Sequence, residues 1–345
     1  MKIRAKKFNY FIGIDVSKNK LDYAVIKGKE LLFHQVGKNE TDDITTFFKK
    51  LKGLPGFTVA KAIFCLEQTG IYGNHLLYAL KKLKANIVLE HPLQIKRSIG
   101  LVRGKDDKSD SIRIAEYAKR NANELKFWIP RRLVVLELMS LFTLRNRLLG
   151  VSNGLKNPLK EEIIFVKKGL QKQTQQLCRG SIKAIECDLS GIDLSIESLI
   201  NSDESLKNLK QMITSVPCVG PITAIQIIIS TNEFKDIKDP KKFACYAGVA
   251  PFKKESGLVT GRAKVSPYAN RKVKALLHVC ALNAIRFDEE LKSYYERKTK
   301  VGGKLKLKVI NAVRYKLILR IFACVNQSRS YIKNYKRENP ITAGE

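Results

Sequence analysis

The first 125 residues alternate short apolar runs with polar, turn-forming stretches. Apolar runs bounded by Lys, Asn and Gly predict β-strands, the first three of which form an antiparallel meander. Stretches with apolar residues every three or four positions predict helices between the later strands. The predicted strands are 8–16, 21–28, 30–37, 60–67 and 86–92, and the predicted helices are 41–52, 71–83 and 109–121. This order predicts an α/β domain with a mixed sheet over residues 1–125.

The pattern becomes mainly helical after this domain. Residues 131–149 are predicted to be helical, and between Gly154 and Ser215 apolar residues recur at three and four positions among many Lys, Gln and Glu. Such spacing predicts long amphipathic helices. We interpret residues 126–210 as a helical spacer or oligomerisation arm, 211–328 as a mainly α-helical domain, and 329–345 as a polar tail.

The segment VPCVGPITAIQIII (216–229) joins a turn containing Pro and Gly to an apolar helix. One interpretation is the second half of a helix-hairpin-helix, in which a helix N-terminus offers N–H groups to a phosphate. The alternative is a core helix after an ordinary Gly-Pro turn.

The net charge of the chain indicates what kind of partner it binds. The chain has 64 Lys+Arg and 32 Asp+Glu, a formal net charge of +32. Such an excess favours binding to a polyanion, and nucleic acid is the leading candidate. A ribosomal or membrane-surface protein can share this balance. The predicted phosphate contacts near the C-terminal basic helices, for which a solvated face is the alternative, are Arg262, Lys264, Arg271, Lys272 and Lys274.

The other composition signals exclude several classes of site. The seven cysteines are scattered, without C-x-x-C spacing, so neither a disulfide framework nor a zinc site is predicted. The four histidines lack paired ligand spacing. No apolar run is long enough to span a bilayer, and no signal-peptide pattern precedes the first strand. A cytoplasmic protein without a membrane partner is therefore expected.

Four carboxylates stand where strands end or a helix begins. Asp15 and Glu67 close apolar strands, and Asp107 and Asp110 lie three residues apart at a predicted helix start. Each has a structural alternative: Asp15 as a turn cap and Asp110 as a helix N-cap. Together they provide the hard oxygen ligands that Mg²⁺ prefers, and a metal ion would relieve their mutual repulsion.

The phrases GIDVSKNKLDYAVI, CLEQTGIYG and KDDKSDSIRIAEYA resemble the three carboxylate motifs of the DEDD transposases. This insertion-sequence family includes the Piv-type DNA invertases and the bridge-RNA-guided recombinases. VPCVGPITA and FACYAGVAPFKKESG resemble its second conserved domain. The resemblance implies an RNase H-like (RuvC-like) N-terminal domain. It also implies Mg²⁺, with Mn²⁺ as a substitute, held by Asp15, Glu67, Asp107 and Asp110, with Asp106 as the alternative third ligand.

The same resemblance implies a serine nucleophile at Ser256, which precedes Gly257. Its hydroxyl would attack the scissile phosphate and hold the DNA covalently. Ser266 is the rival, within VSPYAN, where the family's Lys-Arg-Gly core is absent. The implied partners are element and target DNA, a noncoding guide RNA, and further copies that form dimers and then tetramers. The implied setting is the nucleoid of a bacterium or archaeon.

Three other functions compete with this one. A RuvC-type, structure-specific endonuclease would use the same carboxylates with water as the nucleophile. A sugar-kinase or actin-like protein has a first phosphate loop similar to GIDVSKNKLDYAV, but a second phosphate loop and an adenosine motif are not evident in the sequence. A non-catalytic nucleic-acid-binding protein would use the carboxylates only as caps.

Overall fold

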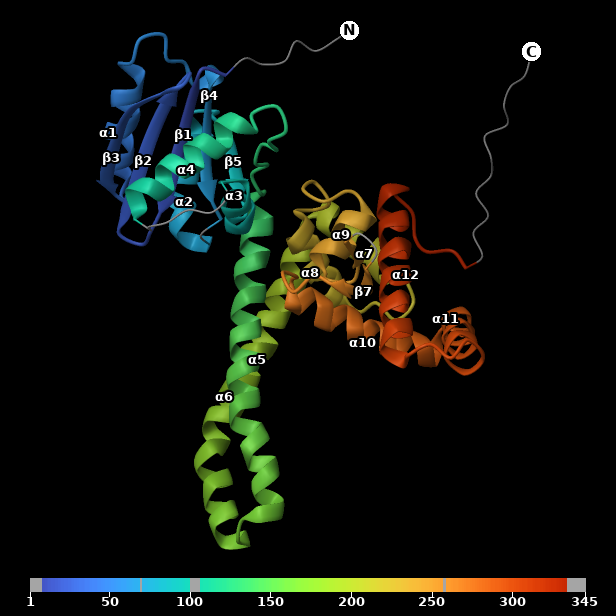
Figure 1. The fold of residues 1–345 in the computed structure, drawn as a ribbon. Coiled ribbons are helices and arrows are strands. Elements are labelled where there is room, and N and C mark those ends of the chain that lie inside the picture. The colour runs from blue at the N-terminus through green and yellow to red at the C-terminus, as the bar shows by residue number, and fades with distance from the viewer. Residues whose placement is uncertain (1–7, 69, 100–105, 257–258, 334–345) are drawn as a thin grey trace, which may run out of the picture. The chain divides into compact units, whose positions relative to one another are not determined.

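The computed structural model describes residues 8–68, 70–99, 106–256 and 259–333, and the chain divides into two compact units. The first unit spans Met1–Pro130 and the second spans Arg131–Glu345 (Figure 1).

The first unit contains one five-stranded sheet in the order β3-β2-β1-β4-β5. β2 pairs antiparallel with both β1 and β3, while β1, β4 and β5 run parallel. This is the predicted mixed sheet, and it confirms the RNase H-like fold. Its elements are β1 (Tyr10–Val16), β2 (Lys20–Lys27), β3 (Glu30–Lys38), α1 (Thr41–Lys52), η1 (Val59–Lys61), β4 (Ala62–Glu67), η2 (Gly70–Gly73), α2 (Asn74–Lys82), β5 (Asn86–Glu90), α3 (Pro92–Ile99) and α4 (Asp107–Arg120).

Helix α3 was not predicted, and the expected strand 86–92 was too long. The strand ends at Glu90, and Pro92 begins the helix. Proline suits a first helical position because its fixed φ is helical and the N–H that it lacks would be unpaired there. The ring of His91 accepts a hydrogen bond from the Leu93 N–H at 3.2 Å, which helps the chain to turn from strand to helix.

Helices cover both faces of the sheet, and each face has its own apolar core. Alternation along β1 sends Ile12 and Ile14 to the face covered by α1 and α2. Phe11 packs on the opposite face, where α4 contributes Ile114, Ala115 and Ala118. The residues at the ends of the strands therefore also divide between the two faces.

Gly13 permits the close contact between β1 and α4. A Cβ atom at this position would lie 2.1 Å from the Ser111 carbonyl oxygen and 2.2 Å from the Ala115 nitrogen. Both atoms belong to the helix backbone, which cannot move aside as a flexible side chain can. The missing side chain therefore sets the distance between helix and sheet.

The second unit is mainly helical, as predicted for the C-terminal region. α5 and α6 run side by side (Figure 1), and α8, with Ile225, Ile227 and Ile228 buried, lies in the core of the unit. This burial supports the core-helix interpretation of residues 216–229. The elements are α5 (Leu133–Phe165), α6 (Lys168–Ser202), α7 (Glu204–Thr214), α8 (Pro221–Thr231), α9 (Pro240–Tyr246), β6 (Pro251–Ser256), β7 (Val259–Val265), α10 (Arg271–Phe287), α11 (Glu289–Glu296), η3 (Arg297–Val301) and α12 (Lys306–Asn326).

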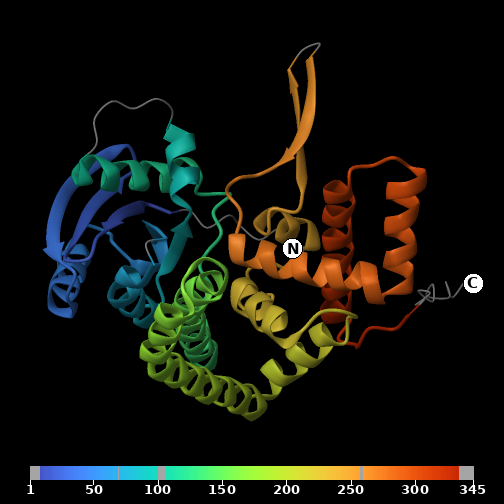
Figure 2. The same ribbon diagram turned by 90° about the horizontal axis from the view of Figure 1, so that it is seen from below.

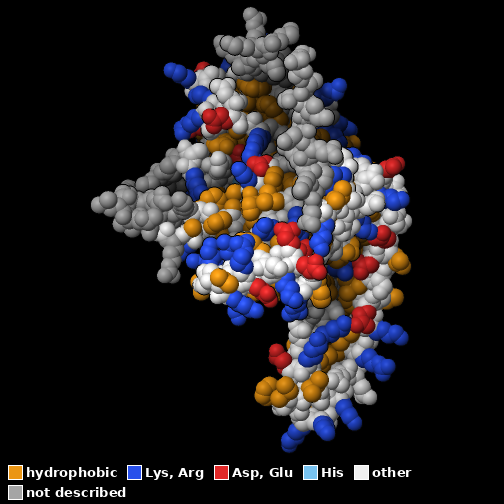
Figure 3. All heavy atoms as spheres, turned by 90° about the vertical axis from the view of Figure 1, so that its right-hand side faces the viewer, with side chains coloured by type: hydrophobic (Ala, Val, Ile, Leu, Met, Phe, Trp, Pro, Cys, Tyr) orange, Lys and Arg blue, Asp and Glu red, His pale blue; other side chains and the backbone are white. Residues whose placement is uncertain are grey.

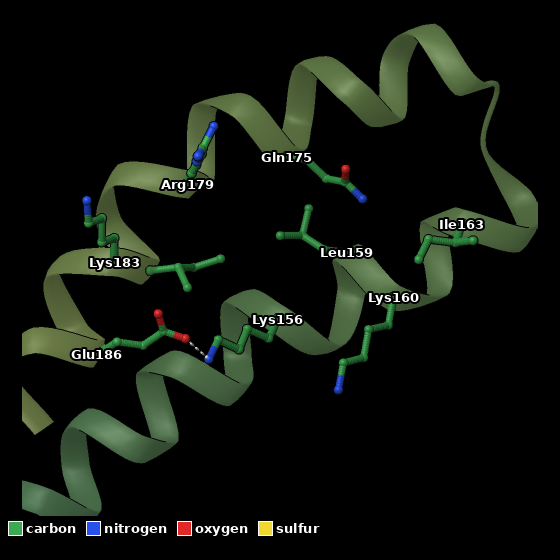
Figure 4. A pocket seen from close by; sticks show the side chains of 9 residues that line it. Lys156, Leu159, Lys160, Ile163, Gln175, Arg179, Lys183 and Glu186 are labelled. Carbon is green, nitrogen blue, oxygen red and sulfur yellow. Dashed lines mark hydrogen bonds and ion pairs between the residues drawn. The ribbon is translucent and has the colours of Figure 1, made fainter. Parts of the chain in front are cut away.

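An open pocket of about 590 Å³ lies between α5 and α6 in the part toward their tip. Leu159 projects into the space between the helices, and the Lys156 ammonium donates to Glu186 across it at 2.6 Å (Figure 4). At the tip, Ile164 and Phe165 are exposed. None of the helices described is long and apolar enough to cross a membrane.

The antiparallel pair β6–β7 is an addition to the predicted helical domain (Figure 2). Its residues PFKKES and VTGRAKV lack the regular apolar alternation of a half-buried strand. Figure 2 shows the ribbon of this pair standing out from the helices, which explains why its sequence lacks apolar alternation.

Candidate active site

Carboxylates gather at one end of the strands, on the face of the sheet that carries α4. Asp15 of β1 pairs in register with Asp22 of β2, and Glu67 of β4 pairs with Glu90 of β5. The last paired positions of β1 and β4 are Ile14 and Leu66, so the residues that follow them lie at the same end of neighbouring strands. We call Asp15, Asp22, Glu67 and Glu90 the acidic row.

The N-terminus of α4 brings two more carboxylates to this row. The pKa of Asp15 is raised, first because the carboxyl is partly buried and then because Asp107, Asp110 and Asp22 repel its charge. The backbone of α4 packs against Gly13 of β1, and Lys20 contacts both Asp107 and Asp22, the strand partner of Asp15. The first turn of α4, with Asp107 and Asp110, therefore lies beside Asp15, although the sequence separates them by more than ninety positions. Of the four predicted ligands, these three therefore lie together, and Glu67 lies at the end of the adjoining strand.

Asp106 has a structural role in this arrangement. It is the N-cap of α4, and its carboxylate accepts hydrogen bonds from the Ser109 N–H at 2.8 Å and the Ser109 hydroxyl at 2.6 Å. These bonds lower its pKa. Asp110, for which the N-cap was the structural alternative, instead accepts from the Arg113 guanidinium at 2.6 Å.

Lys20 places an ammonium group among the carboxylates. Its Nζ lies 2.5 Å from an Asp107 oxygen and 3.3 Å from an Asp22 oxygen. These two hydrogen bonds raise the pKa of Lys20. The lysine thus joins β2 to the first turn of α4 and offsets part of the negative charge.

Asp22 and Glu90 are members of the row that were missed in the sequence. Asp22 is buried, with 3% of its surface exposed, and its carboxylate also contacts the His34 ring nitrogen at 3.1 Å. Glu90 accepts a hydrogen bond from the Tyr117 hydroxyl of α4 at 2.9 Å. The polar residue within the apolar run LDYAVI was the available signal for Asp22, because its strand alternation matches that of Asp15.

The predicted nucleophile Ser256 is the last residue of β6, and its backbone pairs with Val259. The side chains of Ser256 and Arg262 lie outside the described part of the structure. Lys264, Arg271 and Lys272 are exposed on β7 and at the start of α10, and Lys274 is partly buried. The rival serine, Ser266, accepts a hydrogen bond from the Tyr268 N–H at 3.2 Å within its own turn.

A packed turn lies at the base of the β6–β7 hairpin, between β7 and α10. Asn270 caps α10 by accepting from the Val273 N–H, and its amide donates to the Tyr246 hydroxyl at 2.7 Å. Gly248 has φ +63°, and a Cβ there would lie 2.4 Å from that of Ala269. These contacts explain why the Tyr-Ala-Gly turn and the VSPYAN phrase belong to one local structure.

Known proteins resemble the chain over most of its length. A family model described as a transposase, of the DEDD type of insertion sequence IS110, matches residues 12–163. A second model, described as the transposase IS116/IS110/IS902 family, matches residues 210–296. The pilin gene-inverting protein of Moraxella bovis is 22% identical over 336 residues, which cover 94% of this chain and 98% of that protein. The uncharacterized 43.6 kDa protein of insertion element IS110 from Streptomyces coelicolor is 25% identical over 40% of this chain and 34% of its own length.

Among solved structures, that of Thermus thermophilus RuvC matches with a TM-score of 0.27 and 16% identity, over 34% of this chain and 98% of RuvC. The two family models match separate parts of the chain in the expected order. The chain therefore belongs to the IS110 family of DEDD transposases, and it is an enzyme of the transposase and recombinase class that acts on DNA.

Proposed function

We propose that this transposase cuts and rejoins the DNA strands of its insertion sequence with Mg²⁺ held by Asp15, Glu67, Asp107 and Asp110. The observation that carries the proposal is that Asp15, at the end of β1, lies beside the first turn of α4, which carries Asp107 and Asp110. Carboxylates gathered in this way are costly without a cation. DEDD and RuvC-like nucleases generally use divalent metal ions.

The residues fit such an ion in their chemistry. All the donors are carboxylate oxygens, which suit Mg²⁺ and Mn²⁺, and the cluster already accommodates the cationic end of Lys20. Within the described ranges, no three His, Cys, Asp or Glu side chains are arranged to hold a metal ion together. Binding would therefore require Asp107 to exchange Lys20 for the ion. A bound ion would stabilise the negative charge that develops on the phosphate oxygens.

Ser256 is the proposed nucleophile. Its oxygen would form a bond to the scissile phosphorus while one phosphorus–oxygen bond of the DNA breaks, and the proton of the serine would pass to the departing DNA hydroxyl. The phosphoester to serine conserves the bond energy, so a second DNA hydroxyl can reverse the step and rejoin the strand. We further propose that a guide RNA selects the DNA and that dimers pair as tetramers, so that the carboxylates of one copy act with the serine of another.

The test is detection of protein-linked DNA on a denaturing gel after incubation with Mg²⁺ and DNA spanning the ends of the element. A covalent product that disappears in Ser256→Ala and in Glu67→Gln supports serine recombination. Ser266→Ala and Glu116→Gln are the matched controls, since Glu116 pairs with Arg120 on α4 at 2.9 Å. Both controls are expected to retain the product.

A RuvC-type endonuclease with water as the nucleophile is the second candidate, favoured by the DEDD match itself. It predicts metal-dependent cleavage without linked DNA, unchanged in Ser256→Ala and lost in Glu67→Gln. Asp106→Asn and Asp107→Asn separate the two candidates for the third ligand. Only Asp107→Asn is expected to abolish cleavage, whereas Asp106→Asn keeps a side-chain oxygen that can cap α4 and is expected to retain cleavage.

A further inference from the structure

A second group of basic side chains follows the predicted contacts at 262–274 along the sequence. A cavity of about 460 Å³ lies between the end of α11 and the start of α12. Lysines from three successive segments line it: Lys298 from η3, Lys304 from the following loop and Lys308 from α12. No Asp or Glu is among the residues that line it. We call these three residues the lysine pocket.

The nearby carboxylates are all engaged with other cations. Glu296 pairs with Lys300 at 3.7 Å, Glu289 pairs with Lys333 at 2.8 Å, and Asp288 and Glu290 both pair with Arg320 at 2.6 Å. Within the described ranges, no ion pair is found for the three lysines of the pocket. Among the residues that the structure describes, no carboxylate therefore offsets their positive charge.

Two further cations lie beside an aromatic ring of this cavity. Tyr294 lines it, and the Lys316 ammonium lies 4.8 Å from the centre of that ring while the Arg297 guanidinium carbon lies 5.9 Å from it. From Leu291 to Asn326 the sequence contains one acidic residue, Glu296. Figure 3 shows the side of the molecule on which α11 and α12 lie, with blue Lys and Arg side chains gathered beside orange apolar ones.

The backbone around the cavity has an unusual conformation. η3 is a π-helical turn in which the Gly302 N–H donates to the Arg297 carbonyl oxygen at 3.0 Å. Gly303 has φ +57°, and open space surrounds the position of its missing Cβ. Single π-turns are frequent at functional sites. A glycine beside open space leaves the backbone accessible to a ligand.

We propose that the lysine pocket binds backbone phosphates of nucleic acid, as a binding site additional to the hairpin and the start of α10. Three ammonium groups around one concave surface match a chain of phosphates, because each lysine can contact a separate phosphate and release its counterions. The exposed apolar residues of the adjoining loop, Val301 and Leu305, suit contact with sugars and bases. The inference requires neither the metal ion nor Ser256.

The test measures equilibrium binding of the full chain to a 30-base-pair duplex DNA and to a 30-nucleotide single-stranded RNA, by fluorescence anisotropy at several salt concentrations. The variant is the triple substitution Lys298→Gln, Lys304→Gln and Lys308→Gln. Loss of three phosphate contacts is expected to weaken binding about 100-fold at 0.1 M salt and to reduce the slope of log affinity against log salt by about 2 to 3. Cleavage is not measured, so failure here is distinguishable from failure of the proposed chemistry.

The matched control substitutes three exposed lysines of the first unit, Lys49→Gln, Lys52→Gln and Lys81→Gln, and so removes the same charge. The triple change to Arg at the pocket is expected to retain binding. A loss limited to the DNA or to the RNA supports the proposal and identifies the source of the phosphates. An equal loss in the control, or no loss of DNA or RNA binding in the pocket variant, would overturn it.

Discussion

Gly13→Ala should separate α4 from the sheet and so disturb both the fold of the first unit and its acidic site. The added Cβ would begin 2.1 Å from the Ser111 carbonyl oxygen and 2.2 Å from the Ala115 nitrogen. An ordinary contact is at least 3.4 Å, so the helix backbone must retreat by about 1 Å. Overpacking of a rigid core costs about 1–3 kcal/mol, and we expect the upper end because both neighbours are backbone atoms.

A single tryptophan makes this effect measurable in the full chain. Trp128 is the only tryptophan of the sequence, it packs against the core formed with α1 and α2, and its backbone N–H donates to the Ile87 carbonyl oxygen at 2.7 Å. Its fluorescence during urea unfolding therefore reports on the first unit. The midpoint should fall, and binding of Mn²⁺ should weaken because Asp107 and Asp110 move with the helix.

The matched control is Gly37→Ala in β3. A Cβ there would meet its nearest atoms, in Asp43 and Tyr23, at 3.6 Å, which is ordinary contact. The control should unfold close to the wild-type midpoint. An unchanged midpoint in Gly13→Ala would refute the claim that this glycine sets the spacing between helix and sheet.

Other substitutions test separate parts of the molecule. Lys20→Met should raise the affinity for Mg²⁺, measured by calorimetry, because it removes the ammonium that occupies Asp107; lower affinity would show that Lys20 helps to build the site. Arg132→Ala should cost about 2–3 kcal/mol of unfolding free energy in urea, since it leaves the buried Glu233 and the partly buried Asp203 without their shared guanidinium. The Arg132 hydrogen bonds lower the pKa of Asp203 from 3.8 to about 2. Their stabilisation is thus complete above pH 4 and lost as the pH falls toward 2; an acid-unfolding profile shared by Asp203→Asn and wild type would contradict this. Gly154→Ala, within α5 with open space around it, should raise the free energy of unfolding by about 0.5–1 kcal/mol, and a lower melting temperature by circular dichroism would contradict the exposure seen there.

The sheet was predictable because the sequence marks where each of its strands begins and ends. Apolar runs ending at Asp15 and Glu67 mark the strand ends, and turn residues separate the meander strands. Helix α3 was not predictable from the pattern, since Pro92 was interpreted as the end of a strand and it instead begins a helix. The β6–β7 pair was missed because its sequence lacks regular apolar alternation, which is the signal on which strand prediction depends.

The candidate site shows a similar limit. Motif resemblance predicted Asp15, Glu67, Asp107 and Asp110 as the ligands, and their individual positions at strand ends and a helix start were readable from the sequence. The contribution of Asp22 depends on its pairing with Asp15 across β1 and β2, and register is a tertiary property. The same is true of Lys20, whose contact with Asp107 joins segments that are distant in sequence.

The helix pair α5–α6 has a consequence for how this enzyme can diverge. Its helices have 33 and 35 residues, which at about 1.5 Å per residue makes the pair close to 50 Å long. Removing two turns, about seven residues, from each helix would shorten the pair by roughly 11 Å and return its tip to nearly the same orientation. Paired insertions or deletions can thus change how far the tip extends while leaving the carboxylates and the hairpin untouched.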